Sequence, residues 1–176
     1  MQRLVRKLET IPMALDTIKA AAPKNCRVVL YDGISSRHSL FRPGVDSLIV
    51  LYQMHNEAGR ASGEVGHYAC ILKGKTLSYF SSYGLPPEAE IHATHSKGKL
   101  LALLGRRYDW SRSPLQQKRN TATCGLWALA RAYFYRMSNK SFANMMNSRF
   151  SATTPDDMVS IMTLLLVQSE LQSNTQ

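Results

Sequence analysis

The chain has 176 residues, of which 44% are hydrophobic and 19% are charged, a composition typical of a globular protein and not of a disordered chain. Its three cysteines are odd in number and form no CxxC pair or His/Cys cluster, which argues against a disulfide framework or a structural zinc site and favours a reducing compartment. The formal net charge of +10 makes nucleic acid a candidate partner, with a solvated basic face as the alternative.

Hydrophobic periodicity and turn residues predict a single domain over 1–176 with a frayed tail at 172–176. The expected elements are a helix over 10–22, strands over 26–31 and 47–54, a strand hairpin over 67–73 and 76–82, a helix over 88–104, an irregular edge strand over 107–115, and helices over 126–137, 141–147 and 155–171. We therefore expect an α+β fold with a mixed, mainly antiparallel central sheet flanked by helices. No segment has the apolar length of a signal-peptide core or a membrane span, so no membrane contact is expected.

The predicted hairpin brings two polar side chains toward each other. His67 opens its first strand, after a flexible glycine-containing stretch at 55–66, and Ser81 lies near the end of its second strand. Because antiparallel strands return to where they began, we expect His67 and Ser81 to lie close in space.

Cys124 falls in or just before the first turn of the helix predicted from Leu126. There, free backbone N–H groups and the positive end of the helix dipole face the sulfur and favour the reactive thiolate. Gly125 leaves room for a substrate carbonyl to approach the backbone. The competing interpretation is a small buried hydrophobe, which describes most free cysteines, and Cys26 and Cys70 in predicted strands are assigned to that class.

Several motifs link these residues to a known family. In chain order they are Gly66-His67 followed by an aromatic residue, Tyr79-Phe80-x-Ser82-Tyr83-Gly84-Leu85-Pro86, Gln117-x-x-Asn120, Cys124-Gly125 and Pro155-Asp156-Asp157. In this order and spacing the chain resembles the adenovirus maturation protease and, more closely, its relatives in virophages, Polinton-like elements and other large DNA viruses. The wider clan includes the SUMO-deconjugating proteases.

The resemblance implies a compact α+β cysteine endopeptidase whose nucleophile starts a buried central helix. It implies that Cys124 is the nucleophile and His67 the base. The Gln117 side-chain amide is implied as an oxyanion donor beside the Cys124 backbone N–H, and the adjacent Gln116 could hold that role in a shifted register. We expect neither a metal ion nor a resident cofactor, although the adenoviral member of the family is activated by DNA and a short peptide.

The same resemblance implies capsid or scaffold precursor polypeptides as substrates, often cut after small residues such as glycine, in the host cytoplasm, the nucleus or the virion. The basic residues between Lys97 and Arg119 are compatible with binding to viral DNA. One alternative function is the removal of ubiquitin-like modifiers by the same chemistry. Another is a degenerate member that survives as a basic nucleic-acid-binding or capsid-associated protein.

One position departs from the family pattern. Where relatives place Asp or Glu, this chain has Ser81, whose hydroxyl can orient an imidazole but cannot offset its positive charge. Three interpretations stay open at this third triad position. They are a Cys-His dyad oriented by Ser81, an acid supplied from elsewhere such as Glu64, and a weakened enzyme.

Overall fold

The computed structural model describes residues 9–34, 40–55, 61–95, 99–105, 107–116, 121–148 and 154–173. Side chains are described for all of these residues except 55, 61–65 and 169–173.

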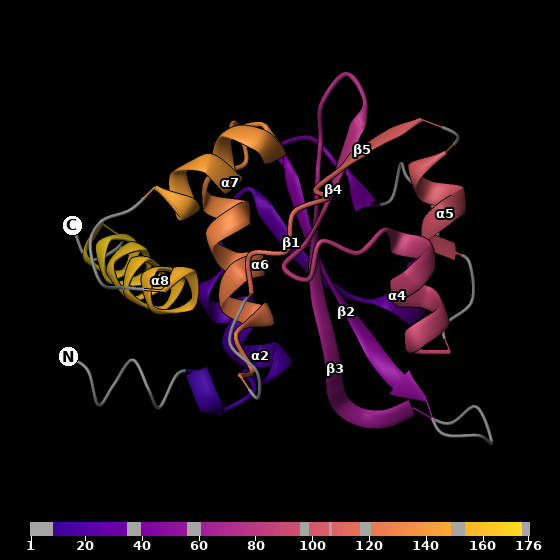
Figure 1. Cartoon of the computed structure of the whole chain (residues 1–176), viewed down its shortest axis with the longest axis horizontal. Coiled ribbons are helices and arrows are strands. Elements are labelled where there is room, and N and C mark those ends of the chain that lie inside the picture. The colour runs from indigo at the N-terminus through magenta and orange to yellow at the C-terminus, as the bar shows by residue number, and fades with distance from the viewer. Residues whose placement is uncertain are drawn as a thin grey trace.

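Five strands form one sheet in the order β1-β2-β3-β4-β5, so each strand lies beside its neighbours in the sequence. The strands are β1 (Cys26–Leu30), β2 (Ser47–His55), β3 (Ala61–Leu72), β4 (Leu77–Ser81) and β5 (Tyr108–Trp110). β3 is antiparallel to β2 and β4, whereas the outer strands β1 and β5 are each parallel to their neighbour. Helices cover both faces of this mixed sheet (Figure 1), which confirms the predicted α+β class.

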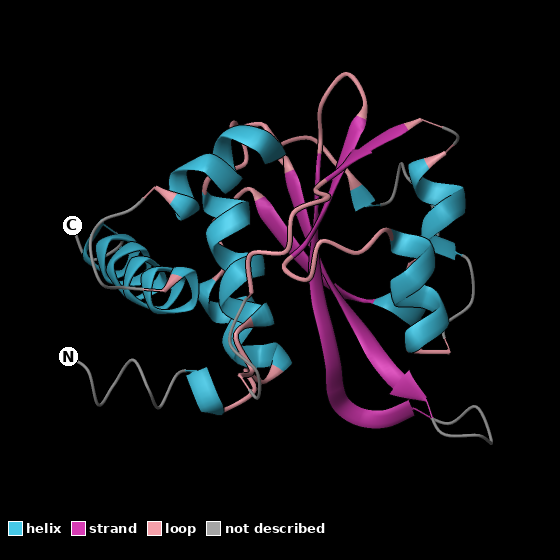
Figure 2. Cartoon of the chain, viewed as in Figure 1, coloured by secondary structure: helices cyan, strands magenta, loops and turns pink. Residues whose placement is uncertain are grey.

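The helices form a layer on each side of the sheet. On one side lie α2 (Leu15–Ala21), α6 (Cys124–Tyr133), α7 (Asn139–Asn147) and α8 (Pro155–Ser173), and on the other α4 (Pro87–Ala93), α5 (Lys99–Leu104) and the 3-10 turn η1 (Tyr31–Gly33) (Figure 2). Successive strand residues face opposite sides, so Leu51 of β2 joins the first core and Val50 the second. Every residue of α6 from Gly125 to Ala132 is buried, which makes α6 the central helix of the first core.

The segment predicted as one helix over 88–104 forms two helices instead. The backbone N–H of Thr94 caps α4 by donating to the Glu90 carbonyl, and the next residue, His95, has a φ of 54°. A residue in the left-handed region does not continue a right-handed helix. The chain therefore leaves the helix at His95, and α4 and α5 pack as separate elements.

The stretch predicted to be flexible, 55–66, is strand at both ends, because β2 runs to His55 and β3 begins at Ala61. His67 therefore lies inside β3 and not at its start, opposite Tyr52 of β2. Its neighbour Gly66 approaches β2 so closely that a Cβ atom would overlap the Tyr52 carbonyl oxygen. Only glycine allows this close approach of two backbones.

Two helix ends also differ from the prediction. α2 begins at Leu15 and not near Thr10, because Ala14 has an extended backbone with φ −65° and ψ 152°. α8 starts at Pro155 as predicted but continues to Ser173, into the tail expected to be frayed. Within the described ranges, no helix is both long and apolar enough to cross a lipid bilayer.

Candidate active site

Cys124 is the first residue of α6, as the sequence predicts. The backbone groups of Tyr68 and Gly125 are close enough to the sulfur to lower the pKa of the thiol. Tyr68 can take part because the described pairing of β3 with β4 begins at Ala69, opposite Ser81, and so stops one residue short of Tyr68. The start of the central helix and the open edge of β3 therefore meet at the thiol.

His67 lies on β3 with its imidazole buried, and the two ring nitrogens have different surroundings. Nε2 is 3.2 Å from the Ser81 hydroxyl oxygen and 3.2 Å from Oε1 of Glu90. Nδ1 is buried and has no partner at hydrogen-bond geometry among the described residues, although the ring as a whole interacts with the Cys124 thiol. Because Ser81 and Glu90 occupy Nε2, Nδ1 is the nitrogen that remains for the thiol.

Ser81 lies next to His67, as the hairpin argument predicts, but it does not act alone. Its hydroxyl donates a 2.6 Å hydrogen bond to Oε1 of Glu90 and accepts one from the backbone N–H of Tyr83 at 3.3 Å. The carboxylate described beside His67 is thus Glu90, whereas the sequence suggested Glu64 as an example. Glu64 lies in β3, where only its backbone is described.

Glu90 is the residue that the sequence analysis missed. It lies in α4 and is only 3% exposed, whereas a glutamate in a predicted surface helix normally faces solvent. A signal was present in the spacing, because Pro87, Ile91 and Thr94 lie on the same helical face as Glu90. Pro87 and Thr94 are buried and Ile91 packs against the second core, so this face of α4 carries Glu90 inward.

The electrostatics of the site favour charge separation between Cys124 and His67. Burial raises the pKa of the Cys124 thiol, but hydrogen bonding and charge interaction with His67, together with the backbone bonds, lower the pKa below its ordinary value of 9.0 overall. Burial lowers the pKa of His67, but interactions with Cys124 and Glu90 raise it to about 9 overall. Both shifts favour the thiolate–imidazolium pair, in which the sulfur is nucleophilic.

The other two thiols have the opposite character. All three cysteines carry free thiols, but burial raises the pKa of Cys26 to about 11 and that of Cys70 well above 9.0. Their strand positions inside the core agree with the interpretation of these two residues as small buried hydrophobes.

The side chains of Tyr83 and Gln116 border the site on the side of the β4–α4 loop. The Tyr83 ring stacks on His67, with 4.5 Å between ring centroids and an interplanar angle of 24°. The Gln116 side-chain amide nitrogen lies 3.5 Å from the Tyr83 hydroxyl and donates to the Thr121 carbonyl at 3.2 Å, while its amide oxygen accepts from the Ser82 hydroxyl at 2.9 Å. Gln116 thereby ties the β4–α4 loop to the segment that leads into Cys124. Gln117, the predicted oxyanion donor, lies outside the described residues.

A buried carboxylate anchors the chain just before the nucleophile. Asp156 of α8 is fully buried and accepts hydrogen bonds from the Thr123 hydroxyl at 2.8 Å and from the Trp127 indole N–H at 3.0 Å. Both donors flank Cys124 at the start of α6. The Pro155-Asp156-Asp157 motif therefore fixes the turn that presents the thiol.

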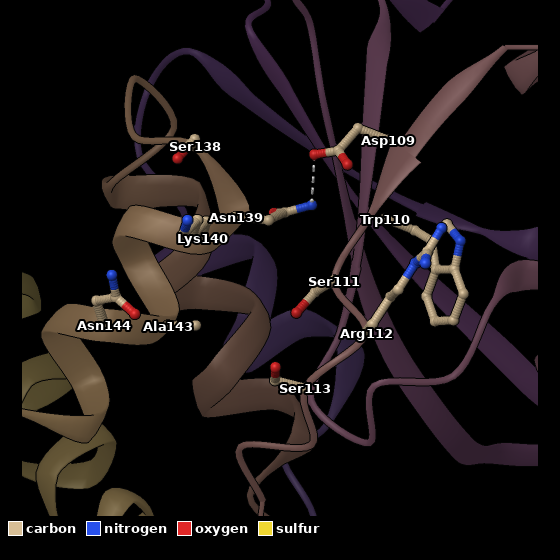
Figure 3. Close-up of a pocket in the computed structure, with 10 residues that line it drawn as sticks. All are labelled: Asp109, Trp110, Ser111, Arg112, Ser113, Ser138, Asn139, Lys140, Ala143 and Asn144. Carbon is tan, nitrogen blue, oxygen red and sulfur yellow. Dashed lines mark hydrogen bonds between the residues drawn. The ribbon is translucent and has the colours of Figure 1, made fainter.

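A hollow of about 420 Å³ lies elsewhere, between α7 and the chain that follows β5. Most of the residues that line it have polar side chains, and Asn139 points across it toward the Asp109 carboxylate, 3.4 Å away (Figure 3). None of its lining residues belongs to the Cys124 site. In the part of the chain that the structure describes, no cluster of three or more His, Cys, Asp or Glu side chains could hold a metal ion.

Comparison with known proteins adds little. No family model matches the sequence, and no curated protein matches it. Solved structures that align with the chain include the central domain of the uncharacterized Lpg1148 protein from Legionella pneumophila, with a TM-score of 0.48 and 14% identity over 92% of this chain and 98% of that one. Another is the ASFV pS273R protease, with a TM-score of 0.34 and 21% identity over 69% of this chain and 44% of that one. At these TM-scores neither structure bears on the activity of this chain.

Proposed function

We propose that this chain is a cysteine endopeptidase that uses Cys124 as nucleophile and His67 as its proton partner. The observation that carries the proposal is the buried imidazole of His67, which interacts with a thiol of lowered pKa at a helix start and, through Nε2, contacts a buried carboxylate. Inert core cysteines lack such partners, as Cys26 and Cys70 do here.

The proposed reaction begins with attack of the Cys124 thiolate on a peptide carbonyl carbon. The oxyanion that forms accepts hydrogen bonds from the Cys124 backbone N–H and the Gln117 side-chain amide. The C–N bond then breaks, and the proton on Nδ1 of His67 goes to the leaving amine, which leaves a thioester. Neutral His67 takes a proton from water as the water attacks the thioester, so the carboxylic acid departs and the thiolate–imidazolium pair is restored.

The proposed substrates are capsid or scaffold precursor polypeptides, and their assignment rests on the resemblance of the sequence motifs. The loop after β4 offers apolar surface for substrate side chains, because Tyr83 and Leu85 are 41% and 38% exposed beside the site. Removal of a ubiquitin-like modifier would use the same centre on a different substrate. The degenerate alternative is weakened, since it depended on the missing acid at position 81 and Glu90 lies in contact with His67.

Labelling of the thiols tests the nucleophile without a substrate. The folded protein is treated with iodoacetamide at pH 7, and the modification of each cysteine is followed by mass spectrometry. We expect Cys124 to react much faster than Cys26 and Cys70, and His67→Ala to slow that reaction. Slow and equal labelling of all three thiols would contradict the proposal.

Co-expression with candidate capsid precursors tests the reaction itself. Wild type should release defined fragments, and Cys124→Ala should release none. A vinyl-sulfone probe of ubiquitin or SUMO that forms an adduct, with no precursor cut, would instead favour the isopeptidase. Repeating the cleavage with and without duplex DNA tests whether DNA, bound through the basic residues between Lys97 and Arg119, activates the enzyme.

A further inference from the structure

We propose that Glu90, which reaches His67 from helix α4, supplies the negative charge of the site, and that Ser81 assists Glu90 and does not replace it. This inference rests on the proposed function of Cys124 and His67. It makes Glu90 a positioning residue that acts on the thiol through His67.

The hydrogen bonds among Ser81, Glu90 and His67 show which group donates each proton, and so assign the roles of Ser81 and Glu90. A serine hydroxyl has one proton, and the 2.6 Å distance from Ser81 Oγ to Glu90 Oε1 is that of a short bond from a hydroxyl to a carboxylate. The Ser81 proton is therefore committed to Glu90. The proton on Nε2 of His67 is shared between Glu90 and Ser81, at 3.2 Å from each oxygen, which leaves Nδ1 to exchange a proton with Cys124.

Because Ser81, Glu90 and His67 are buried, the negative charge of Glu90 acts strongly on the His67 ring. Ser81 is fully buried and Glu90 is 3% exposed, so the carboxylate interacts with His67 through a medium that screens much less than water. A buried carboxylate is expensive unless it is paired, and the partners found here are the Ser81 hydroxyl and the His67 ring. Among the described side chains, the other titratable groups that face His67 are the Cys124 thiol of α6 and the Tyr83 phenol of the β4–α4 loop, so Glu90 is the acid described in contact with the ring.

The same geometry makes position 81 and position 90 mutually exclusive sites for an acid. An aspartate introduced at position 81 would place a second carboxylate within contact of Glu90, in a pocket closed to solvent. Two carboxylates that share such a site cannot both ionise without a large penalty. Ser81 is therefore the residue that fits a site whose acid comes from α4.

A charge-only substitution provides the first test. Glu90→Gln preserves the shape and one acceptor oxygen but removes the charge. Cys124 alkylation at pH 7 should slow about 10- to 100-fold, the range for losing a hydrogen bond to a charged group. The rising limb of its pH profile, where the thiol loses its proton, should move about one unit or more to higher pH, because a destabilised imidazolium lowers the thiol pKa less. Glu88→Gln is the matched control, because Glu88 lies on the exposed side of α4 and accepts from the Tyr108 hydroxyl. We expect no change from it.

Relocating the acid provides the second test. Ser81→Asp alone should slow Cys124 alkylation, because it removes the hydroxyl that donates to Glu90 and keeps one of the two carboxyl groups protonated. Ser81→Asp combined with Glu90→Gln should react faster than Glu90→Gln alone. Ser81→Ala, which keeps the carboxylate, should cost less than Glu90→Gln. The inference is overturned if Glu90→Gln behaves like Glu88→Gln, if Ser81→Asp alone accelerates the reaction, or if Ser81→Ala is the more damaging change.

These outcomes separate the inference from the proposed function. Alkylation needs no substrate, so a pH profile that responds to Glu90→Gln in a protein that cuts no peptide would contradict the endopeptidase and leave the role of Glu90 standing. Precursor cleavage that is unaffected by Glu90→Gln would contradict the role of Glu90 and leave the endopeptidase standing. Circular dichroism and urea unfolding of each variant show whether its fold is retained before its rates are compared.

Discussion

The Thr123 hydroxyl donates a 2.8 Å hydrogen bond to the Asp156 carboxylate, and this bond joins the start of α8 to the residue immediately before Cys124. The Trp127 indole donates to the same carboxylate oxygen from one turn into α6. The position of the thiol therefore depends on a helix that is distant in the sequence.

Asp156→Ala should destabilise the protein by about 3 kcal/mol, because it leaves two buried donors without an acceptor, each at a cost of about 1–3 kcal/mol. Urea unfolding measures the loss. The adjacent Asp157→Ala is the control, since Asp157 caps α8 at Thr154 in a half-buried position and should cost about 1 kcal/mol. Equal losses from the two variants would show that Asp156 has no special anchoring role.

The rate of peptide cleavage should follow a bell-shaped pH profile. On the acid side, activity should rise as Cys124 loses its proton, at a pH below 9.0 because the thiol pKa is lowered. On the alkaline side, activity should fall near pH 9, where His67 loses the proton that the leaving amine needs. Measurement of kcat/KM from pH 5 to 10 checks both limbs, and a falling limb near 6.5, the ordinary histidine value, would show that His67 is not held in its charged form.

Gln117→Ala should lower kcat about 100- to 1000-fold, as the loss of one oxyanion donor does elsewhere. Gln116→Ala should act differently, because its amide is engaged with Thr121 and Ser82. We expect it to loosen the loop and change kcat by less than about tenfold. Steady-state kinetics on one peptide shows which variant loses more kcat. A larger loss in Gln116→Ala than in Gln117→Ala would make Gln116 the oxyanion donor.

Gly66→Ala should destabilise the protein by about 2 kcal/mol or more, because the added methyl group meets the Tyr52 carbonyl oxygen. Activity should fall with it, since Gly66 precedes His67 in β3. Gly33→Ala is the control: no atom lies within 4 Å of its added methyl group, and its unfolding free energy should stay within about 0.5 kcal/mol of wild type. A Gly66→Ala protein as stable as wild type would mean that the two strands can separate locally.

Local patterns were sufficient where a structural feature depends on neighbouring residues. The hairpin that joins His67 to Ser81 was predictable because strand alternation and a short turn fix which residues meet. The place of Cys124 at the start of α6 was predictable to within a turn, because the helical apolar repeat begins at Leu126. The break at His95 was not, since a single left-handed residue leaves no periodic signal in the apolar pattern.

The sequence alone singled out Cys124 as a candidate nucleophile and His67 as its candidate partner, and it predicted that Ser81 lies next to His67, because each follows from a motif or a local element. The contact of Glu90 with His67 and Ser81 came from the packing of α4 against the sheet. The approach of Tyr68 to the sulfur came from β3 extending past its pairing with β4. Both relationships join segments far apart in the chain, and such contacts depend on how whole elements pack, which local spacing does not encode.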